Sequence, residues 1–566
     1  MSETQPLIDL KKLEERNHKH NLSISKRPIL TALYLGSFLA SLDNTVVANM
    51  METVSNEFHE SEKKQYIATS FLLTNTAFQP LYGKLSDLIG RKPALLIALT
   101  FFWVGCTITM FANSVTQFSI GRFICGMGCG GVNSLSSVIV SDICDARMRG
   151  IMQGYSNLVF AAGQFLGAPI GGVIIDTIGW RYVFGLQVPL VIICQFLVYN
   201  NVNIKLAHVP KHGKYAWAHL KRLDIGGTFT LTCTIGSLLI LSSDDGMLSA
   251  FSKHMLYLAG LIFGILFFLT EFFWASERLI PFEVLLGKTG VVSVIIVISS
   301  FVIFGDIFRK PLYLQLMQNF SPADCGVFTI FTSLAAPVAS FATGFITKHT
   351  KKSVEYVCYE LCLFAVTLQL TGFLLECILV DYLKPKLGLD SAVTSLELYN
   401  LLDTDKFFWK VLLVITSLMC GYGYCTVLVA TLVVVVFTVD KSQQGTVTGL
   451  FYLWRSLGTV IGTSFILTTY QKVLNKKLFN YIVLKLGSLE NYEKIIHDSS
   501  QVRMLYKDDI KITEKLLTIF NQSFVISYIP QIVILLLTVV MTFLFVVEMK
   551  KSLDTDVEDD KNVESP

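Results

Sequence analysis

Charged residues are scarce in this chain. Asp, Glu, Lys and Arg make up only 16% of its 566 residues, the formal net charge is +3, and 52% of the residues are apolar. A mean hydropathy of +0.56 is too high for a water-soluble protein of this length. Since neither sign of charge is in excess and no arginine-rich patch occurs, nucleic acid is not expected as a partner. The composition indicates that the solvent of this chain is a membrane.

The sequence also lacks the patterns on which enzymes and metal sites depend. No nucleophile and base pair, metal-ligand cluster or glycine-rich phosphate loop accompanies the apolar segments. Most cysteines lie inside apolar runs, where they are expected to pack as small residues: Cys106, Cys125, Cys129, Cys194, Cys233, Cys358, Cys362, Cys420 and Cys425. We therefore expect no enzymatic activity, no cofactor and no metal.

Fourteen apolar runs have the length that a transmembrane helix needs, which is about 20 residues for a hydrocarbon core about 30 Å thick. The first run follows a polar start, residues 1–27, without a cleavage site, so no signal peptide is expected. The pattern predicts an all-α polytopic membrane protein. The runs are 28–50, 65–84, 94–112, 117–140, 150–173, 181–200, 224–243, 254–274, 290–308, 323–346, 354–379, 408–437, 446–470 and 524–547.

Basic residues in the short loops predict the orientation. With a cytoplasmic N-terminus the inner loops hold about 16 Lys and Arg and the short outer loops about 6, which favours cytoplasmic termini. The expected organisation is a cytoplasmic tail 1–27, a six-helix bundle 28–200, a cytoplasmic connector 201–223, two inserted helices 224–274, a second six-helix bundle 290–548 with a lumenal loop 471–523, and an acidic, disordered cytoplasmic tail 549–566.

An internal repeat supports two related bundles. The fifth and thirteenth segments share a Gln-Gly pair followed by two glycines at the same offsets: Gln153, Gly154, Gly167 and Gly171 in one, Gln444, Gly445, Gly458 and Gly462 in the other. Both segments are the fifth of six if 224–274 is an insertion. The predicted arrangement is therefore six, two and six helices.

The loop after the second segment reads GKLSDLIGRK, residues 83–92. Gly83 allows two helices to approach closely, and Gly90 permits a sharp turn. Asp87 can face the N-terminus of a helix in the other bundle, where the helix dipole stabilises a carboxylate by about 0.3–1 kcal/mol. Such a contact would act as a latch between two conformations; the alternative is a merely basic loop. The loop matches the signature of the major facilitator superfamily at Gly83, Leu85, Asp87, Gly90, Arg91 and Lys92.

The fifth segment carries GQFLGAPIGG, residues 163–172, which resembles the antiporter motif of that superfamily. The resemblance rests on Gly163, Gly167, Gly171 and Gly172. Pro169 departs from the motif, whose proline directly follows the glycine at the position of Gly167. The alternative is a generic interface of small residues between helices.

Three charges lie inside apolar segments, where each costs about 2.5–3.5 kcal/mol and is expected to be paired or to line a cavity. They are Asp43, Arg122 and Arg455. The segment around Asp43 resembles the first-helix motif of the fourteen-helix drug and proton antiporters. Arg122 with Gly126 resembles the fourth-helix motif that is linked there to proton transfer. Asp43 would take a proton when its arginine partner moves away, because a carboxylate in a low dielectric needs a counter-charge. A static pair that only orients helices is the alternative.

Other polar residues allow weaker predictions. Asp306, beside Arg309 and Lys310, is expected to form a solvated pair near the end of its helix. Several amides line a central cavity or, equally well, form hydrogen bonds between helices: Asn44, Asn49, Asn75, Gln79, Asn133, Asn157 and Gln164. Glycosylation sequons occur at Asn319 and Asn521.

Together these features resemble the fungal fourteen-helix branch of the major facilitator superfamily, and within it the vacuolar basic amino acid transporters. The resemblance covers about residues 28–548 and includes GWRYVF at 179–184. It implies a proton-coupled antiporter in the vacuolar membrane that moves Lys, Arg or His from cytosol to lumen, with Asp43 binding both proton and substrate. The alternatives are a multidrug and proton antiporter of the plasma membrane and a nutrient sensor with a transporter fold.

A short N-terminal pattern agrees with the vacuolar address. Glu3, Leu7 and Ile8 have the acidic dileucine form that sorting adaptors bind. The expected partners are thus a basic amino acid, protons, membrane lipids and a sorting adaptor.

Overall fold

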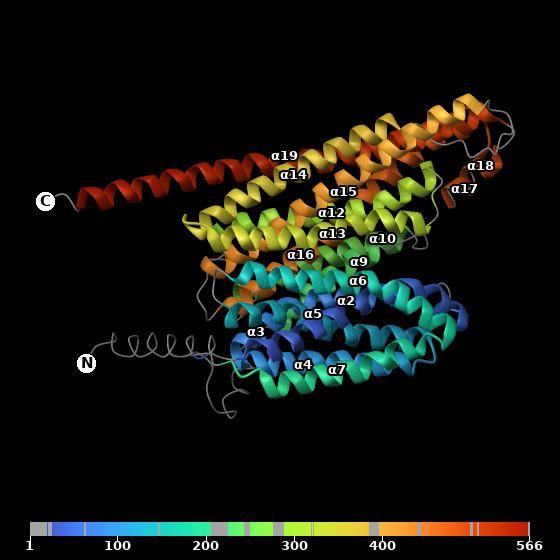
Figure 1. Cartoon of the computed structure of the whole chain (residues 1–566). Coiled ribbons are helices and arrows are strands. Elements are labelled where there is room, and N and C mark those ends of the chain that lie inside the picture. The colour runs from blue at the N-terminus through green and yellow to red at the C-terminus, as the bar shows by residue number, and fades with distance from the viewer. Residues whose placement is uncertain are drawn as a thin grey trace, which may run out of the picture. The chain divides into compact units, whose positions relative to one another are not determined.

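The computed structural model is helical over nearly all of its described residues and contains no strand among them (Figure 1). The structure describes residues 20, 25–60, 64–144, 148–204, 225–242, 250–274, 288–318, 320, 322–383, 396–438, 443–497, 502–506 and 509–563. The proposed sorting signal at Glu3, Leu7 and Ile8, most of the connector 201–223 and the sequon at Asn319 lie outside them.

The helices follow the apolar runs closely. The first group is α2 (Lys26–Glu57), α3 (Lys64–Ile89), α4 (Arg91–Met110), α5 (Val115–Ile143), α6 (Arg149–Thr177) and α7 (Arg181–Asn201). Next come α9 (Ile225–Ser242), α10 (Ala250–Leu269) and η3 (Thr270–Trp274). The last group is α12 (Lys288–Gln318), α13 (Pro322–His349), α14 (Val354–Tyr382), α15 (Leu396–Thr438), α16 (Gln444–Leu478), η4 (Phe479–Val483), α17 (Leu489–His497), α18 (Val502–Leu505) and α19 (Ile510–Val563).

Each of the fourteen predicted runs corresponds to a described helix. Ten of these helices are by themselves long and apolar enough to cross a bilayer. Large apolar side chains stay exposed on them, for example Phe196 of α7 and Leu537 of α19, as expected where lipid rather than water is the solvent. The chain is a multi-pass membrane protein; the count of fourteen spans remains a prediction.

Two segments differ from the sequence prediction. The stretch 471–523, predicted as a loop, is largely helical, because α16 continues to Leu478 and α19 already begins at Ile510. The acidic tail, predicted to be disordered from residue 554 on, continues α19 as far as Val563. Both segments are polar but contain almost no Gly or Pro, so the helix continues beyond the apolar run.

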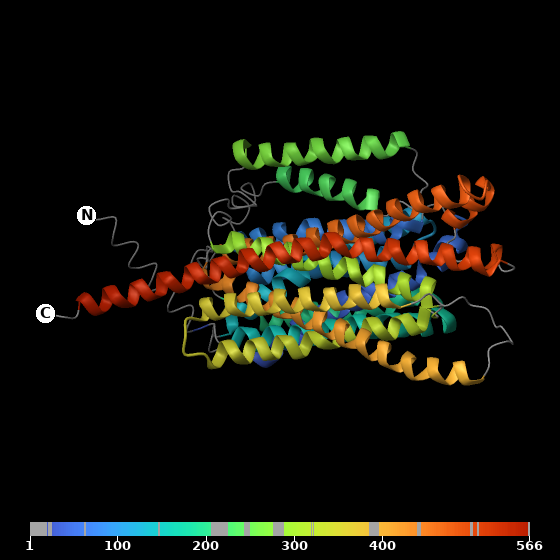
Figure 2. The same cartoon turned by 90° about the horizontal axis from the view of Figure 1, so that it is seen from above.

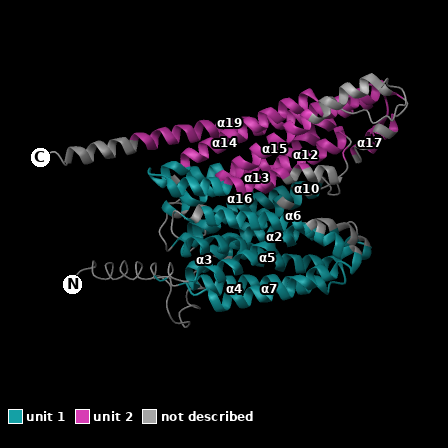
Figure 3. Cartoon of the chain, viewed as in Figure 1, with its two compact units in different colours: residues 1–296, 340–358, 428–457 teal, residues 297–339, 359–427, 458–566 magenta. Residues whose placement is uncertain are grey.

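Contacts divide the chain into two compact units (Figure 3). Unit 1 comprises residues 1–296, 340–358 and 428–457; unit 2 comprises 297–339, 359–427 and 458–566. In unit 1 an apolar core of α2, α3, α4, α5 and α7 includes Phe102, Phe118 and Phe184. Helices α9 and α10 lie side by side (Figure 2), and α9 also contacts α3. These two units do not test the bundle boundaries that the sequence predicts.

Candidate functional site

Asp43 of α2 and Arg122 of α5 form a buried ion pair in unit 1. Both oxygens of Asp43 accept hydrogen bonds from one Arg122 amino group, at 2.8 and 2.7 Å. The Asp43 side chain is fully buried and that of Arg122 is 1% exposed. The sequence placed these two charges in different apolar helices, and the fold brings them into direct contact.

Aromatic rings and thiols surround this ion pair. The Arg122 guanidinium lies 4.2 Å from the ring centroid of Phe71 and 5.7 Å from that of Phe184. Cys125 donates to Asp43 at 3.5 Å, and the Arg122 Nε has no hydrogen-bond partner among the described atoms. The arginine therefore has one carboxylate partner and an apolar wall, so the two charges depend on each other.

A carboxylate and two thiols meet at the same place. The ligand atoms of Asp43, Cys125 and Cys129 lie within 4.8 Å of one another, a spacing that a metal ion could bridge. A cation is already in place, because the Arg122 amino group lies 2.7 Å from the carboxylate. Two positive charges at one carboxylate repel each other strongly in a low dielectric. The geometry therefore favours an arginine ion pair over a metal centre.

The glycines of the antiporter-like motif pack α6 against the part of α2 that carries Asp43. A Cβ on Gly163 would lie 2.6 Å from the Phe38 carbonyl oxygen, and one on Gly171 would lie 2.9 Å from Val46 Cγ1. On Gly167 it would lie 2.0 Å from Thr45 Oγ1. Three glycines of the motif are thus required by a helix contact.

Two members of this motif differ from those three. A Cβ on Gly172 would meet nothing within 4 Å, so Gly172 takes no part in the contact with α2. Pro169 lies within α6, and its side chain is outside the described part of the structure. The position of Asp43 therefore depends on Gly163, Gly167 and Gly171.

We expect Gly167→Ala to lower the free energy of unfolding by about 1–3 kcal/mol, because an added methyl must push α6 away from α2. The matched control is Gly172→Ala, whose methyl enters open space. Thermal unfolding of the purified variants in detergent measures the difference. An equal shift in both variants would contradict the tight contact.

The internal repeat reproduces the same packing in unit 2. A Cβ on Gly458 of α16 would lie 2.4 Å from the carbonyl oxygen of Val297, and one on Gly462 would lie 2.1 Å from that of Phe301, both in α12. The fifth helix of each predicted bundle therefore packs on the first. No acidic residue of α12 occupies the place of Asp43, however, because the acid of that helix, Asp306, lies further along. The repeat preserves the packing and not the charges.

Asp87 of the signature loop is bound to the start of α16. Its carboxylate accepts hydrogen bonds from the backbone N–H of Gly445 at 3.1 Å and from that of Thr446 at 2.7 Å. The Thr446 hydroxyl donates to it at 2.8 Å. These residues belong to the first turn of α16, whose N–H groups have no partner within the helix. The helix N-terminus contact expected for Asp87 is present; its action as a latch stays a prediction.

The rest of the loop positions Asp87. Arg91 donates to Asp87 at 2.5 Å and to Asp142 at 2.8 Å, with its side chain fully buried. Gly90 has a φ of 97°, a conformation that favours glycine. A Cβ on Gly83 would lie 2.3 Å from the carbonyl oxygen of Gly445, so only glycine allows α3 and α16 to approach this closely.

Lys92 lies at the rim of this arrangement. It donates to Asn203 at 3.1 Å, and its ammonium lies 4.8 Å from the ring centroid of Tyr199. Unlike Arg91, it is only half-buried and contacts neither Asp87 nor Asp142 through a hydrogen bond given by the structure. The buried part of the motif therefore ends at Arg91.

Arg455 and the amides predicted to line a cavity differ in their burial and in their hydrogen-bond partners. Arg455 is half-buried in α16, whereas the ion pair of Asp43 is with Arg122. Gln79 accepts from Ser456 at 3.3 Å and Asn157 donates to Ser340 at 2.8 Å, which favours hydrogen bonding between helices for these two. Asn44, Asn75, Asn133 and Gln164 are half-buried, and the Asn49 side chain is outside the described part.

Asn521 is buried in α19 and donates to the Val380 carbonyl, which argues against glycosylation.

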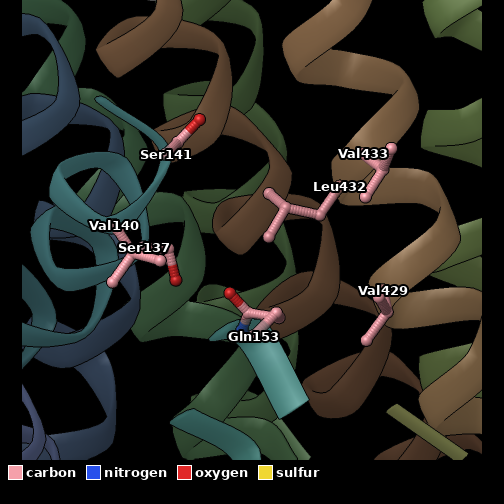
Figure 4. A pocket seen from close by; sticks show the side chains of 7 residues that line it. All are labelled: Ser137, Val140, Ser141, Gln153, Val429, Leu432 and Val433. Atoms are coloured by element: carbon pink, nitrogen blue, oxygen red, sulfur yellow. The ribbon is translucent and has the colours of Figure 1, made fainter. Parts of the chain in front are cut away.

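A small pocket opens in unit 1 near the contact between Asp87 and the start of α16 (Figure 4). Its polar lining consists of Ser137, Ser141 and Gln153, and its apolar lining of Val140, Val429, Leu432 and Val433. Gln444 donates to Ser141 at 2.5 Å beside it. No charged side chain lines this pocket, so it offers no counter-charge to a cationic ligand.

The prediction of a solvated pair at Asp306 is wrong. Asp306, Arg309 and Lys310 of α12 are 2%, 0% and 5% exposed. Asp306 pairs with Arg309 at 2.7 Å and with Lys310 at 3.0 Å, and Lys310 also pairs with Glu376 of α14 at 3.1 Å. Position near the end of an apolar run suggested solvent, but α12 extends to Gln318 and other helices of unit 2 cover this face.

Sequence reasoning missed Glu376, Tyr528 and Gln531, which complete this cluster. Glu376 is fully buried, accepts a hydrogen bond from Tyr528 at 2.9 Å, and lies in α14. Gln531 accepts from Arg309 at 2.5 Å. The signal was available for Glu376, since it is an acidic residue within the apolar run 354–379.

Comparisons with known proteins agree with this architecture. Residues 33–463 match the family model of the Major Facilitator Superfamily. The crystal structure of the human organic anion transporter MFSD10 is 14% identical, has a TM-score of 0.50, and matches over 90% of this chain and 99% of its own; at this identity it shows the fold alone.

Curated relatives cover most of the chain. The vacuolar basic amino acid transporter 1 of Saccharomyces cerevisiae is 47% identical over 544 residues, which are 94% of this chain and 94% of the relative. The multidrug resistance protein fnx1 of Schizosaccharomyces pombe is 31% identical over 82% of both chains. The vacuolar basic amino acid transporter 2 of Saccharomyces cerevisiae is 30% identical over 70% of this chain and 80% of its own.

The fold, the buried charge pairs and these matches define a polytopic α-helical membrane transporter rather than an enzyme. The chain belongs to the Major Facilitator Superfamily.

Proposed function

We propose that this chain is a proton-coupled antiporter that moves lysine, arginine and histidine from the cytosol into the vacuole. The substrate class is supported by the relative that is 47% identical over 94% of both chains, a vacuolar basic amino acid transporter. Proton coupling is supported by the buried ion pair between Asp43 and Arg122, because ionisable groups inside a membrane bundle normally serve function. This ion pair is the main structural support for the proposed proton coupling.

Asp43 exchanges partners during transport. When Arg122 moves away, the carboxylate binds either a proton or the cationic group of the substrate, and one negative charge does not bind both. The faces of Phe71 and Phe184 stabilise the guanidinium through cation–π interactions. Each unit of pH gradient then supplies about 1.4 kcal/mol for every proton that returns to the cytosol.

The signature loop acts as the latch of this cycle. Asp87 holds the start of α16 through three hydrogen bonds, and Arg91 holds Asp87 in place. Release of these bonds separates α3 from α16 at this end of the molecule. With the cytoplasmic termini that the loop charges favour, this contact closes the path to the cytosol.

The vacuolar membrane is the proposed location. It is supported by the two vacuolar relatives from Saccharomyces cerevisiae. An adaptor that binds Glu3, Leu7 and Ile8 would deliver the protein there. Fluorescence microscopy of a tagged chain in which Leu7 and Ile8 are both replaced by alanine tests this signal, with retention at the vacuole as the contradicting result.

Uptake into vacuolar vesicles tests the function. We expect ATP-driven uptake of labelled lysine, arginine or histidine that disappears when the pH gradient is collapsed, and that Asp43→Asn abolishes. The matched control is Glu57→Gln in the same helix, because Glu57 is an exposed acid paired with Arg181; it should transport normally. Gradient-dependent uptake that persists in Asp43→Asn would rule out Asp43 as the coupling residue.

A second candidate is multidrug and proton antiport, which the similarity to fnx1 favours. If well-folded protein takes up none of the three amino acids but exports a cationic dye against a pH gradient, this second function holds instead. The same Asp43→Asn variant then tests coupling with the dye as substrate.

A further inference from the structure

A buried network of charges occupies the interior of unit 2, formed by α12, α14 and α19. It contains two acids and two bases, namely Asp306, Glu376, Arg309 and Lys310, and all four are at most 5% exposed. Its formal net charge is zero, which is the condition for burying several charges together. The network does not include the glycine contact between α16 and α12 that repeats the contact between α6 and α2. The internal repeat therefore does not account for these four charges.

We propose that Glu376 is a second proton-binding carboxylate of the transport cycle, which exchanges its ion pair with Lys310 for a proton. In the protonated state Glu376 is a neutral acid, and the Lys310 ammonium pairs with Asp306 alone. This inference rests on the proposed function, because it concerns the number of protons moved with each substrate.

The two acids differ in their number of ion-pair partners, and this difference makes Glu376 the better candidate for protonation. Among the described residues, Asp306 pairs with both Arg309 and Lys310, whereas Glu376 pairs only with Lys310. Protonation of Asp306 would leave Arg309 without any carboxylate partner. Protonation of Glu376 leaves every cation with one, since Lys310 keeps its contact with Asp306 at 3.0 Å.

The two oxygens of Glu376 have different surroundings. Oε1 accepts a hydrogen bond from the Tyr528 hydroxyl at 2.9 Å. Oε2 lies 3.1 Å from the Lys310 ammonium, which is its one charged contact among the described residues. A proton on Oε2 therefore replaces the contact with Lys310 alone, and the bond from Tyr528 continues to hold the side chain.

Unpartnered polar atoms continue along α14 from Glu376. Gln369, two turns away on the same helix, is fully buried, and neither its amide oxygen nor its amide nitrogen has a partner among the described residues. It packs against α15 at Gly423, and the Thr426 hydroxyl one turn further is buried without a partner as well. Buried polar groups of this kind normally bind water, which is the medium that a proton needs.

The helices that carry the network also have weak points beside it. Pro311 follows Lys310 in α12, and Pro530 lies between Tyr528 and Gln531 in α19. A proline has no N–H to donate to the carbonyl four residues earlier, so each helix lacks one backbone hydrogen bond there. Local rearrangement of Lys310 and Tyr528 is accordingly less costly than in an unbroken helix.

The groups that face Glu376 come from three helices. They are Asp306, Arg309, Lys310 and Tyr313 of α12, Cys420 of α15 and Tyr528 of α19. The tyrosines and the cysteine are neutral acids that do not replace Lys310 as a counter-charge. Lys310 is therefore the partner whose movement decides whether Glu376 carries a proton.

Proton stoichiometry in proteoliposomes tests the proposal. Purified full-length protein is reconstituted, the membrane potential is clamped, and the equilibrium accumulation of labelled lysine is measured against the imposed pH gradient. We expect Glu376→Gln to move one proton fewer per lysine, which lowers accumulation about tenfold per unit of pH gradient. Exchange of lysine for lysine should persist. Asp381→Asn is the matched control, because Asp381 is an exposed acid on the same helix.

An infrared measurement separates this proposal from the proposed function. The difference spectrum of the purified protein between neutral and acidic pH should contain a protonated-carboxyl band that Glu376→Gln lacks and Asp43→Asn retains. This readout needs no transported substrate, so it stays informative if lysine is not the substrate. An unchanged band in folded Glu376→Gln, or an unchanged stoichiometry, overturns the proposal.

A conservative variant covers the case in which Glu376→Gln does not fold. Glu376→Asp keeps a carboxyl group at this place and should retain both the band and the full stoichiometry, with a shifted pH dependence. Absence of the band from folded Glu376→Asp also overturns the proposal.

Discussion

Replacing Arg122 with alanine should destabilise the protein by about 3–5 kcal/mol, because it leaves Asp43 as an uncompensated charge in a buried site. Uptake driven by a pH gradient should be lost as well. Chemical unfolding in detergent measures the stability and vesicle uptake the activity. The control is Arg181→Ala, which removes a half-exposed arginine paired with Glu57 and should destabilise the protein less than Arg122→Ala.

A double variant decides between a coupling pair and a static one. Asp43→Asn combined with Arg122→Gln removes both charges and keeps side chains of similar size, so stability should return close to that of the intact protein. Coupled uptake should stay absent, since position 43 no longer has a carboxylate that exchanges a proton for the cationic substrate. Recovery of gradient-driven uptake in this double variant would show that the ion pair only orients α2 and α5.

Asp87→Asn should weaken transport at least tenfold. Asp87 accepts three hydrogen bonds from the start of α16, and bonds to a charged group contribute about 1.5–3 kcal/mol each. Loss of one such bond already changes the population of the closed contact by about tenfold. Vesicle uptake of the labelled substrate gives the rate.

Opening of the contact can be followed directly. Thr448 of α16 is 1% exposed and its hydroxyl has no hydrogen-bond partner in the described part of the chain, so Thr448→Cys is a mild reporter. A membrane-impermeant maleimide should label this cysteine faster in Asp87→Asn than in the parent protein. Lys92→Ala, at the rim of the motif, should leave the labelling rate unchanged. Equal labelling in all three proteins would contradict the latch.

Local patterns explain how much of the fold the sequence could predict. Runs of about 20 apolar residues located the fourteen helices that correspond to them, because the length of a span is set by the bilayer. Glycine spacing indicated a close helix contact of α6, since Gly163, Gly167 and Gly171 recur on one face of a helix, and the structure identifies α2 as the partner. The polar composition of 471–523 and of the tail did not indicate that α16 and α19 continue into them.

The candidate site was predictable only in part. The apolar surroundings of Asp43 and Arg122 marked both as buried charges, and Arg455 had the same signature. Hydropathy reports how apolar a window is and says nothing about which faces of two helices meet. Asp306 was therefore assigned to solvent although it is buried, and Glu376 passed unnoticed inside an apolar run.

The sequence by itself determined that this chain is a helical membrane protein, where its helices lie, and that it carries a transporter signature. Those properties depend on composition and on residues close together in the chain. Tertiary structure alone decided that Asp43 pairs with Arg122, that Asp87 holds the first turn of α16, and that Lys310 bridges Asp306 and Glu376. A buried charge must have a partner, but the packing of helices distant in sequence decides which partner it has.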